Sequence, residues 1–320
     1  MTALVGADSI REAARELQGV AVRTPLLDAP WLAEQVGGEV RLKCESFQPI
    51  GAFKLRGAYT MVARLPESQR AGGVVTYSSG NHAQAVAFAA RAFGIPAVIV
   101  MPENAPRVKV EGTRRLGAEI IQKGRTSEER RGRAEAVQAE RGMVMVPPFD
   151  HPDIIAGQGT VGLEILEDWP DVEAIVVPIG GGGLISGVAA WVKRERPDVR
   201  VVGVEPEGAP TLHRSIEAGE VVTLDATGSI ADGLIPVKPG PLTFAHVRDL
   251  VDELVLVSDD SIRLAASRLL LRGKLLVEYS GAATVAAVLN GAAASGRTAA
   301  IISGGNIDPD RIPELLTPSS

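Results

Sequence analysis

The chain has 320 residues, of which 45% are hydrophobic and 22% charged, and this balance argues against a disordered, collagen-like or coiled-coil protein. Its net charge is −6 and no basic block occurs, so it lacks the electrostatic footprint of a nucleic-acid binder. A single cysteine, Cys44, excludes a disulfide framework, a four-cysteine zinc site and an iron–sulfur cluster. Because Cys44 lies in an alternating apolar stretch, we predict that it is buried.

The amino-terminal residues resemble an ordinary amphipathic helix. Residues 1–17 lack the basic and apolar regions of a signal peptide, and no run approaches the ~18 apolar residues needed to cross a bilayer. The Ser9-Ile10-Arg11-Glu12 pattern predicts a capping box that opens the first helix. We therefore expect a cytoplasmic protein with a small-molecule partner and with neither a nucleic-acid nor a membrane partner.

Strand-like and helix-like segments alternate along the chain. Valine- and isoleucine-rich runs predict strands over residues 73–77, 97–101, 119–121, 143–146, 174–178, 199–204, 251–257 and 299–302. Amphipathic or alanine-rich runs predict helices over residues 81–93, between the strand that ends at 101 and residue 116, and over 127–141, 154–168, 184–194, 261–272 and 282–289. Continuous apolar strands between helices indicate parallel sheets covered on both faces. We expect an α/β protein of two lobes, with one segment of the chain inserted into the larger lobe.

Two loops that follow predicted strands carry groups able to bind anions. In the first, Ser78, Ser79, Asn81 and His82 lie beside a helix amino terminus, which suits a carboxylate. The second contains Gly180–Gly183, where main-chain N–H groups can close around a phosphate. Neither a Walker sequence nor a dinucleotide fingerprint is present, so a single phosphate fits best. Simple turns are the alternative interpretation of both loops.

A third loop and one lysine complete the candidate site. Ser303 follows the last predicted strand in Ser303-Gly304-Gly305-Asn306, where its hydroxyl can hydrogen-bond a ring nitrogen. Lys54 is expected in the first turn of a helix, where the helix dipole lowers the pKa of its amine. A neutral lysine amine can form a Schiff base. An exposed lysine is the ordinary alternative, and the phosphate-like loop favours the functional interpretation.

Together these motifs resemble the fold-type II pyridoxal-phosphate enzymes, in the branch of threonine/serine dehydratases and serine racemases. The motifs that carry the resemblance are Gly51-Ala52-Phe53-Lys54-Leu55-Arg56-Gly57-Ala58, Ser78-Ser79-Gly80-Asn81-His82, Ala156-Gly157-Gln158-Gly159-Thr160, Gly180–Gly183, Ala231-Asp232-Gly233 and Ser303-Gly304-Gly305-Asn306. The resemblance implies two open, mostly parallel twisted sheets with helices on both faces, as in the tryptophan synthase β fold. It also implies a large cofactor-binding domain over residues 1–52 and 148–320, an inserted small domain over 53–147, and a homodimer. Because the chain ends soon after Ser303, we expect no regulatory carboxy-terminal domain and no feedback inhibition by isoleucine.

The resemblance assigns roles to individual residues. Lys54 would hold pyridoxal 5'-phosphate as a Schiff base and take the α-proton of the substrate, while Ser79 would serve the opposite face of the α-carbon. The other cofactor contacts would be Phe53 against the ring, Asn81 at the phenolic oxygen, Gly180, Gly181, Gly182 and Gly183 at the phosphate, Ser303 at the ring nitrogen, and Gly233 and Glu278 near the pocket. The substrate carboxylate would meet Ser78, Ser79, Asn81 and His82, with Arg130 near the position of a carboxylate-binding arginine; this alignment can slip by one residue.

The implied reaction is β-elimination. Ser303 is a neutral partner for the ring nitrogen, which favours loss of the β-hydroxyl over transamination. L-threonine would give 2-oxobutyrate and ammonia, and L-serine would give pyruvate and ammonia. The alternatives are racemisation of serine or 3-hydroxyaspartate, with or without dehydration, and dehydration of a bulkier 3-hydroxy amino acid. A cofactor-binding protein without turnover is a further alternative.

Two departures from the family pattern concern the metal site and one loop. Serine racemases of this branch hold a divalent cation between a glutamate, a main-chain carbonyl and an aspartate. Here Glu205 and Ala209 match the first two positions, but Thr211 replaces the aspartate. Loss of one carboxylate weakens a site for Mg²⁺ or Ca²⁺, so a divalent cation is not favoured. Tyr279 follows Glu278 where many relatives have proline, and we expect it to alter this loop.

Overall fold

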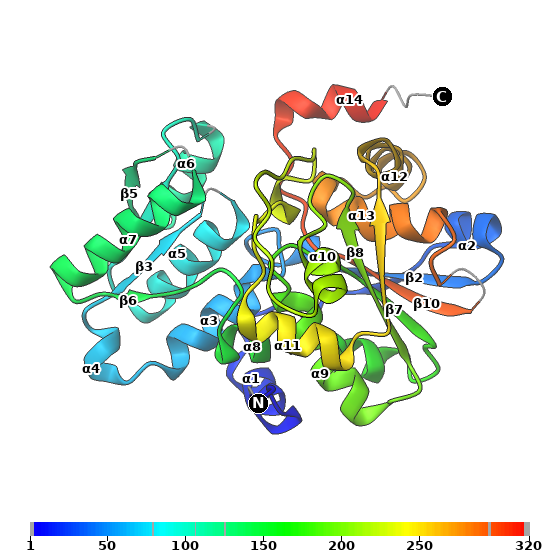
Figure 1. Ribbon diagram of the computed structural model, residues 1–320, viewed down its shortest axis with the longest axis horizontal. Helices are drawn as coiled ribbons and strands as arrows, with labels where there is room; N and C mark the ends of the chain where they lie inside the picture. The colour runs from blue at the N-terminus through cyan, green and yellow to red at the C-terminus, as the bar shows by residue number, and fades with distance from the viewer. Residues whose placement is uncertain (1–2, 79, 106, 125, 294–295, 317–320) are drawn as a thin grey trace.

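The computed structural model describes residues 3–316 except 79, 106, 125 and 294–295. Within them the strands form one sheet of six, in the order β1-β2-β10-β7-β8-β9, and one of four, in the order β5-β4-β3-β6 (Figure 1). The strands are β1 (Leu26–Asp28), β2 (Glu39–Cys44), β3 (Val74–Tyr77), β4 (Ala97–Met101), β5 (Glu119–Gln122), β6 (Val144–Met145), β7 (Ala174–Pro178), β8 (Arg200–Pro206), β9 (Glu253–Val257) and β10 (Arg297–Ile302).

Helices surround both sheets. The α-helices are α1 (Ala7–Glu16), α2 (Pro30–Val36), α3 (Lys54–Arg64), α4 (Glu67–Arg70), α5 (Asn81–Phe93), α6 (Arg107–Arg115), α7 (Ser127–Arg141), α8 (Pro152–Asp168), α9 (Gly183–Glu195), α10 (Thr211–Ala218), α11 (Pro241–Leu250), α12 (Asp259–Leu271), α13 (Tyr279–Leu289) and α14 (Ile312–Leu316). Short 3-10 turns are η1 (Glu45–Phe47), η2 (Asp232–Leu234) and η3 (Pro309–Arg311).

The predicted apolar runs correspond to β3–β10, whereas β1 and β2 were not predicted. Only β1 pairs antiparallel, with β2, while the other pairings between these strands are parallel. All the residues of β4 and β7 are buried, as expected for strands covered on both faces. The predicted α/β class with two mostly parallel sheets is therefore confirmed.

Alternate side chains of β10 pack into two different hydrophobic clusters, one on each face of the six-stranded sheet. Ala299 and Ile301 pack into the apolar cluster formed with α8 and α9. Ala300 and Ile302 pack into the cluster formed with α12 and α13. Successive side chains of a strand point to opposite faces, so the six-stranded sheet is buried on both sides.

Helix α3 connects the two layers. It packs against α5, which covers the four-stranded sheet, and against α8, which covers the six-stranded sheet. A Cβ atom on Gly157 of α8 would lie 2.6 Å from the carbonyl oxygen of Arg56, so α3 and α8 cross with their backbones nearly touching. The amino terminus of α3, with Lys54, is thereby placed between the two sheets. The division at residues 1–52, 53–147 and 148–320 stays a prediction, although every strand of the smaller sheet falls within 53–147.

The predicted capping box at Ser9 is wrong. Helix α1 begins at Ala7 with Gly6 as its N-cap and has no side-chain cap, so Ser9 lies inside the helix. The Ser9 hydroxyl instead accepts a hydrogen bond of 2.9 Å from the Arg64 guanidinium of α3. The Ser9 hydroxyl therefore contributes to the packing of α1 against α3 instead of capping the start of α1.

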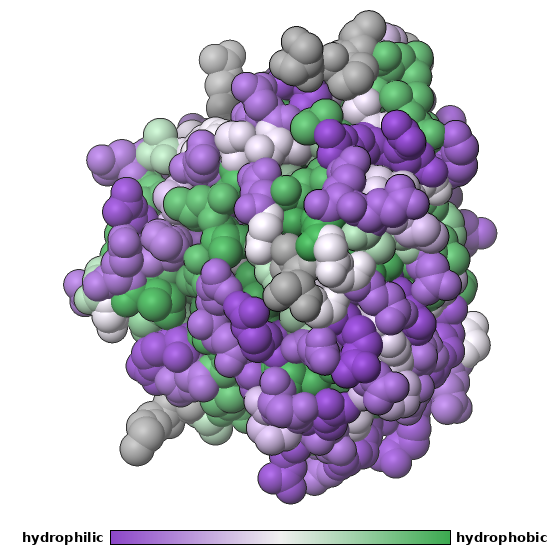
Figure 2. Space-filling view, turned by 90° about the vertical axis from the view of Figure 1, so that its right-hand side faces the viewer, coloured by the Kyte–Doolittle hydropathy of each residue, from purple (hydrophilic) through white to green (hydrophobic). Residues whose placement is uncertain are grey.

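Polar and apolar side chains alternate on one face of the molecule (Figure 2). On the face shown in Figure 2, apolar side chains are exposed in separate patches between polar ones. Cys44 is fully buried, as predicted, and burial raises the pKa of its thiol to about 12. Among the described residues, no helix combines the length and the hydropathy that a membrane crossing requires.

Candidate active site

Lys54 is the first residue of α3, as the sequence predicts. Its Nζ atom donates a hydrogen bond of 2.7 Å to the carbonyl oxygen of Pro148, and it lies 5.1 Å from the centroid of the Phe53 ring. Burial of the amine lowers its pKa from 10.5 to about 8. A substantial fraction of this amine is therefore neutral at mildly alkaline pH, which nucleophilic and base chemistry both require.

The glycines at 180–183 form a closely packed turn between β7 and α9. Gly182 has a φ of 92°, and Gly183 opens α9, whose first N–H groups have no partner inside the helix. A Cβ atom on Gly181 would lie 2.1 Å from the ring of Phe149, and one on Gly180 would lie 2.8 Å from the carbonyl oxygen of Gly233. Side chains would fill this turn, so glycine is required for its close approach to neighbouring groups.

We expect Gly181→Ala to weaken the protein and its affinity for a phosphate-bearing cofactor. The new methyl group must displace the Phe149 ring, and overpacking of this kind costs about 1–3 kcal/mol. The matched control is Gly112→Ala in α6, where a Cβ atom would meet nothing within 4 Å. Urea denaturation and cofactor titration measure both effects. Equal behaviour of the two variants would contradict the assigned role of the turn.

Three polar side chains are hydrogen-bonded to one another beside the loop that precedes α3. They are Asn81, Glu278 and Asn306. Asn81 Nδ2 donates to Glu278 Oε1 at 2.6 Å, and Asn306 Nδ2 donates to Asn81 Oδ1 at 2.7 Å. Asn306 Nδ2 also donates to the carbonyl oxygen of Ile50 at 2.8 Å. Asn81 begins α5 on the smaller sheet, whereas Glu278 precedes α13 on the larger one. The three side chains therefore join the two layers at the candidate site.

Glu278 gives the site a pH-dependent stability. Burial raises its pKa from 4.5 to about 7, with the negative charge of Asp232 acting in the same direction. The folded protein therefore holds this proton more tightly than the unfolded chain, and the stability from it is lost as pH rises from about 4.5 through about 7. We expect Glu278→Gln to show a smaller fall in the free energy of unfolding across this window. Urea denaturation of both proteins at several pH values measures the difference, and parallel curves would contradict this assignment.

Ser303 is buried at the end of β10. Its hydroxyl lies 3.5 Å from the carbonyl oxygen of Ser280, a long contact, while its own carbonyl accepts from the N–H of Phe53 at 3.1 Å. The Ser280 hydroxyl accepts from the N–H of Gly233 at 2.9 Å. Hydrogen bonds thus connect the segments of Phe53, Ser303 and Gly233, three distant residues that the family resemblance assigns to one site.

The loop before α5 is described only in part. Ser79 lies outside the described residues, and the Ser78 hydroxyl accepts from the N–H of Gly80 at 3.3 Å. His82 is buried, and its Nε2 lies 3.0 Å from the carbonyl oxygen of Val146. Burial and the charge of Lys54 lower the pKa of His82 to about 3, so the imidazole is neutral and can donate to that carbonyl. Its predicted contact with a substrate carboxylate stays a prediction.

Arg130 lies on α7, partly buried. Burial lowers the pKa of its guanidinium, and its predicted part in substrate binding stays a prediction. The capping box at the start of this helix is made by Thr126 and Glu129.

The sequence did not lead us to predict a buried ionic cluster, which lies two residues beyond Lys54 at Arg56. Arg56, two residues along α3, pairs with Glu45 at 2.8 Å and with Glu164 at 2.7 Å. Lys43 of β2 pairs with Glu164 at 2.6 Å and donates to the carbonyl oxygen of Thr24 at 2.7 Å. Lys43 in the alternating apolar stretch before Cys44 and Arg56 beside Lys54 are the charged residues in the sequence that could have revealed it. The cluster fixes the start of α3 against β2 and α8.

The residues that match a metal site are used differently here. Glu205 is buried, and its two carboxylate oxygens accept from the N–H groups of Leu212 and His213, each at 2.8 Å. The Thr211 hydroxyl donates to the same carboxylate at 3.1 Å. Glu205 therefore caps the amino terminus of α10, and these residues do not fit a divalent cation. No group of three or more His, Cys, Asp or Glu side chains with metal-ligand spacing occurs among the described residues.

We expect Thr211→Val to destabilise the protein and Thr211→Ser to retain its stability. Valine keeps the shape of threonine but removes the hydroxyl donor, and one buried hydrogen bond contributes about 0.5–1.5 kcal/mol. Thermal unfolding with and without added Mg²⁺ measures the effect. A Mg²⁺-dependent rise in the melting temperature of the wild type would contradict the capping role.

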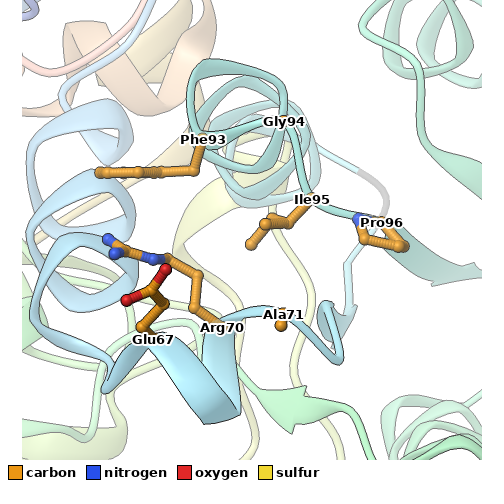
Figure 3. A pocket seen from close by; sticks show the side chains of 7 residues that line it. All are labelled: Glu67, Arg70, Ala71, Phe93, Gly94, Ile95 and Pro96. Carbon is orange, nitrogen blue, oxygen red and sulfur yellow. The ribbon is translucent and has the colours of Figure 1, made fainter.

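A surface hollow of about 400 Å³ lies away from these residues, between α4 and the end of α5. Figure 3 shows Arg70 reaching below the ring of Phe93, whose centroid lies 4.7 Å from the guanidinium carbon. None of the predicted site residues lines it. The hollow therefore has no part in the candidate active site.

Comparisons with known proteins place this geometry in a family. The family model described as "Pyridoxal-phosphate dependent enzyme" matches residues 17–304. An L-threonine ammonia-lyase of Thermotoga maritima is 47% identical over 98% of this chain and 78% of its own length. The catabolic L-threonine dehydratase of Escherichia coli K12 is 40% identical over 97% of this chain and 96% of its own length. The structure of maize serine racemase superposes with a TM-score of 0.94 at 42% identity, covering 98% of this chain and 97% of that one. The chain therefore belongs to the family of pyridoxal-phosphate dependent enzymes.

Proposed function

We propose that this protein is an L-threonine ammonia-lyase that also accepts L-serine. The observation that carries the proposal is the placement of the Lys54 amine, with its pKa of about 8, in the same region as the glycine turn and Ser303. The identity to the Thermotoga maritima and Escherichia coli enzymes supports the substrate class.

The described residues fit pyridoxal phosphate. The turn at Gly180–Gly183 lies too close to Phe149 and Gly233 for side chains, and it leads into the amino terminus of α9, where a phosphate is stabilised. The Ser303 hydroxyl makes only a long contact of 3.5 Å, so it can turn to a ring nitrogen. Phe53, beside Lys54, supplies an aromatic surface for the ring.

When bound, pyridoxal phosphate withdraws electrons from the α-carbon of an attached amino acid and so acidifies its α-proton. Lys54 would hold the cofactor and, in its neutral form, accept that proton. The N–H groups of the glycine turn would bind the phosphate. Ser78 and Asn81 would orient the substrate carboxylate at the amino terminus of α5, together with Ser79, which lies outside the described residues.

The net reaction balances without an external oxidant. L-threonine loses its α-hydrogen and its β-hydroxyl as water, and hydrolysis of the remaining C–N bond consumes one water. The products are 2-oxobutyrate and ammonia. Ser303, a neutral side chain, would not keep a ring nitrogen protonated as an aspartate would, and this favours elimination over transamination.

A substrate panel tests the proposal. With L-threonine, we expect 2-oxobutyrate and ammonia in a one-to-one ratio, with L-serine a slower substrate that yields pyruvate. Chiral chromatography of the remaining amino acid separates this activity from racemisation, which the similarity to maize serine racemase makes the second candidate. D-serine accumulation without 2-oxo acid would contradict the ammonia-lyase proposal.

We also propose a cytoplasmic homodimer, on the family resemblance. Size-exclusion chromatography with light scattering tests the dimer, and a monomer at micromolar concentration that retains full activity would contradict it.

A further inference from the structure

Glu278, the N-cap of α13, and the first two residues of that helix make three different long-range contacts. Glu278 accepts the hydrogen bond of Asn81, and Ser280 accepts that of Gly233, both within the proposed cofactor site. Tyr279, between them, points elsewhere: its hydroxyl donates to Glu314 Oε2 of α14 at 2.8 Å. The residue between two site contacts is therefore bonded to the carboxy-terminal helix.

The contact of Tyr279 with the carboxy-terminal segment has several parts. The guanidinium carbon of Arg311 lies 4.5 Å from the centroid of the Tyr279 ring, and Arg311 pairs with Glu314 at 3.2 Å. We name Tyr279, Arg311 and Glu314 the carboxy-terminal clamp. Tyr279 is 3% exposed, so its hydroxyl could not be left unpaired without cost.

Helix α14 is itself anchored to the larger layer. The carbonyl oxygen of Leu315 accepts from the Ser267 hydroxyl of α12 at 2.6 Å, and Leu315 is fully buried. Figure 1 shows α14 at the upper edge of the molecule, on the side where α12 and α13 lie. The clamp therefore ties the start of α13 to a helix that α12 holds in place.

Charge interactions connect the clamp to α6 of the smaller layer. The charge of Arg311 interacts with that of Asp232, and Asp232 pairs with Lys109 of α6 at 2.5 Å. Asp232 and Gly233 lie in η2, which Ser280 holds. A displacement of α13 at Tyr279 would thus move Glu278, η2 and the contact to Asn81 together.

We propose that Tyr279 is a positioning residue, whose hydrogen bond to Glu314 sets the place of Glu278 and Ser280 in the cofactor site. The inference rests on the proposed cofactor site but not on the identity of the amino-acid substrate. It assigns the carboxy-terminal segment a function in catalysis rather than in folding alone.

The test uses Tyr279→Phe, Glu314→Gln and the double variant in the full-length holoenzyme. Tyr279→Phe keeps the ring and removes only the hydroxyl. The matched control is Glu173→Gln, whose carboxylate pairs with Arg297 at 2.8 Å at the opposite ends of the strands. The readouts are the visible absorption spectrum of bound pyridoxal phosphate, its dissociation constant, and kcat and KM for L-threonine.

We expect Tyr279→Phe to change the absorption spectrum and raise the cofactor dissociation constant about 3- to 10-fold, as the loss of one hydrogen bond implies. We expect kcat to fall with KM little changed, since the clamp does not contact substrate. Glu314→Gln weakens the contact with Tyr279 and also the pairing with Arg311, so Tyr279→Phe should have a smaller effect in this background than in the wild type. The control should match the wild type in every readout.

Two results would overturn the inference. One is a Tyr279→Phe holoenzyme whose spectrum, cofactor affinity and kcat equal those of the wild type. The other is a lower melting temperature alone, which would reduce the clamp to a structural contact. A wild type that binds cofactor but does not deaminate threonine would contradict the proposed function. The role of Tyr279 would then still be tested by the absorption spectrum and the cofactor dissociation constant.

Discussion

Replacement of Lys54 by alanine should abolish turnover, lowering kcat/KM for L-threonine at least about 10³-fold, because general acid–base catalysis alone contributes about 10²- to 10⁴-fold. The variant loses the Lys54 amine, whose pKa burial lowers to about 8. It should also lose the visible absorption of the covalently held cofactor. Spectrophotometry and a 2-oxo acid assay measure both effects on one sample.

Lys238→Ala is the matched control for this prediction. Lys238 is exposed in the loop before α11, so its removal should leave the spectrum and turnover unchanged. A Lys54→Ala protein that retains both the absorption band and activity would remove Lys54 from the site. Retained folding of the variant is checked by its urea denaturation curve.

Replacement of Arg56 by methionine should produce the largest loss of stability, about 3–5 kcal/mol in the free energy of unfolding. The guanidinium is 1% exposed and bonds two buried carboxylates, those of Glu45 and Glu164. Without it, only Lys43 remains to balance two negative charges in the cluster. Removing one partner of a buried pair leaves a charge that neither water nor a counter-charge compensates.

Two further variants sharpen this prediction. Arg131→Met breaks an exposed pair of 2.8 Å with Glu135 on α7, and it should cost no more than about 0.5 kcal/mol. Arg56→Lys keeps the charge but cannot bond both carboxylates in the same planar geometry, so it should fall between the wild type and Arg56→Met. Urea denaturation compares all three. An Arg56→Met protein as stable as Arg131→Met would show that the cluster contributes nothing to folding.

The sequence predicts the sheets well because the strands are buried on both faces. The runs at 97–101 and 174–178 are continuous and apolar, and they match β4 and β7 residue for residue. The helix predicted over 81–93 also matches α5, since an alanine-rich run ends at Gly94, a left-handed C-cap. The short helices α10 and α14 were missed because their few residues give too little periodicity.

Periodicity and local motifs do not predict which distant segments contact one another. The sequence brings Lys54 to the first turn of α3, but not the carbonyl of Pro148 that its amine contacts, 94 positions away. The Ser9 pattern fits a capping box locally, yet the hydroxyl bonds Arg64. Thr211 was noted only as a missing aspartate, whereas its hydroxyl joins two main-chain N–H groups in binding Glu205. Each of these hydrogen bonds depends on tertiary packing, which a short stretch of sequence does not predict.

Reduction of the cofactor-loaded protein with borohydride, followed by peptide mapping, tests the central claim most directly. Borohydride makes the bond between lysine and pyridoxal phosphate permanent, so mass spectrometry identifies the lysine that carried it. We expect about one equivalent of label per chain, on the peptide that contains Lys54. Label on another lysine, or an unlabelled protein that still deaminates L-threonine, would contradict the assignment of this site.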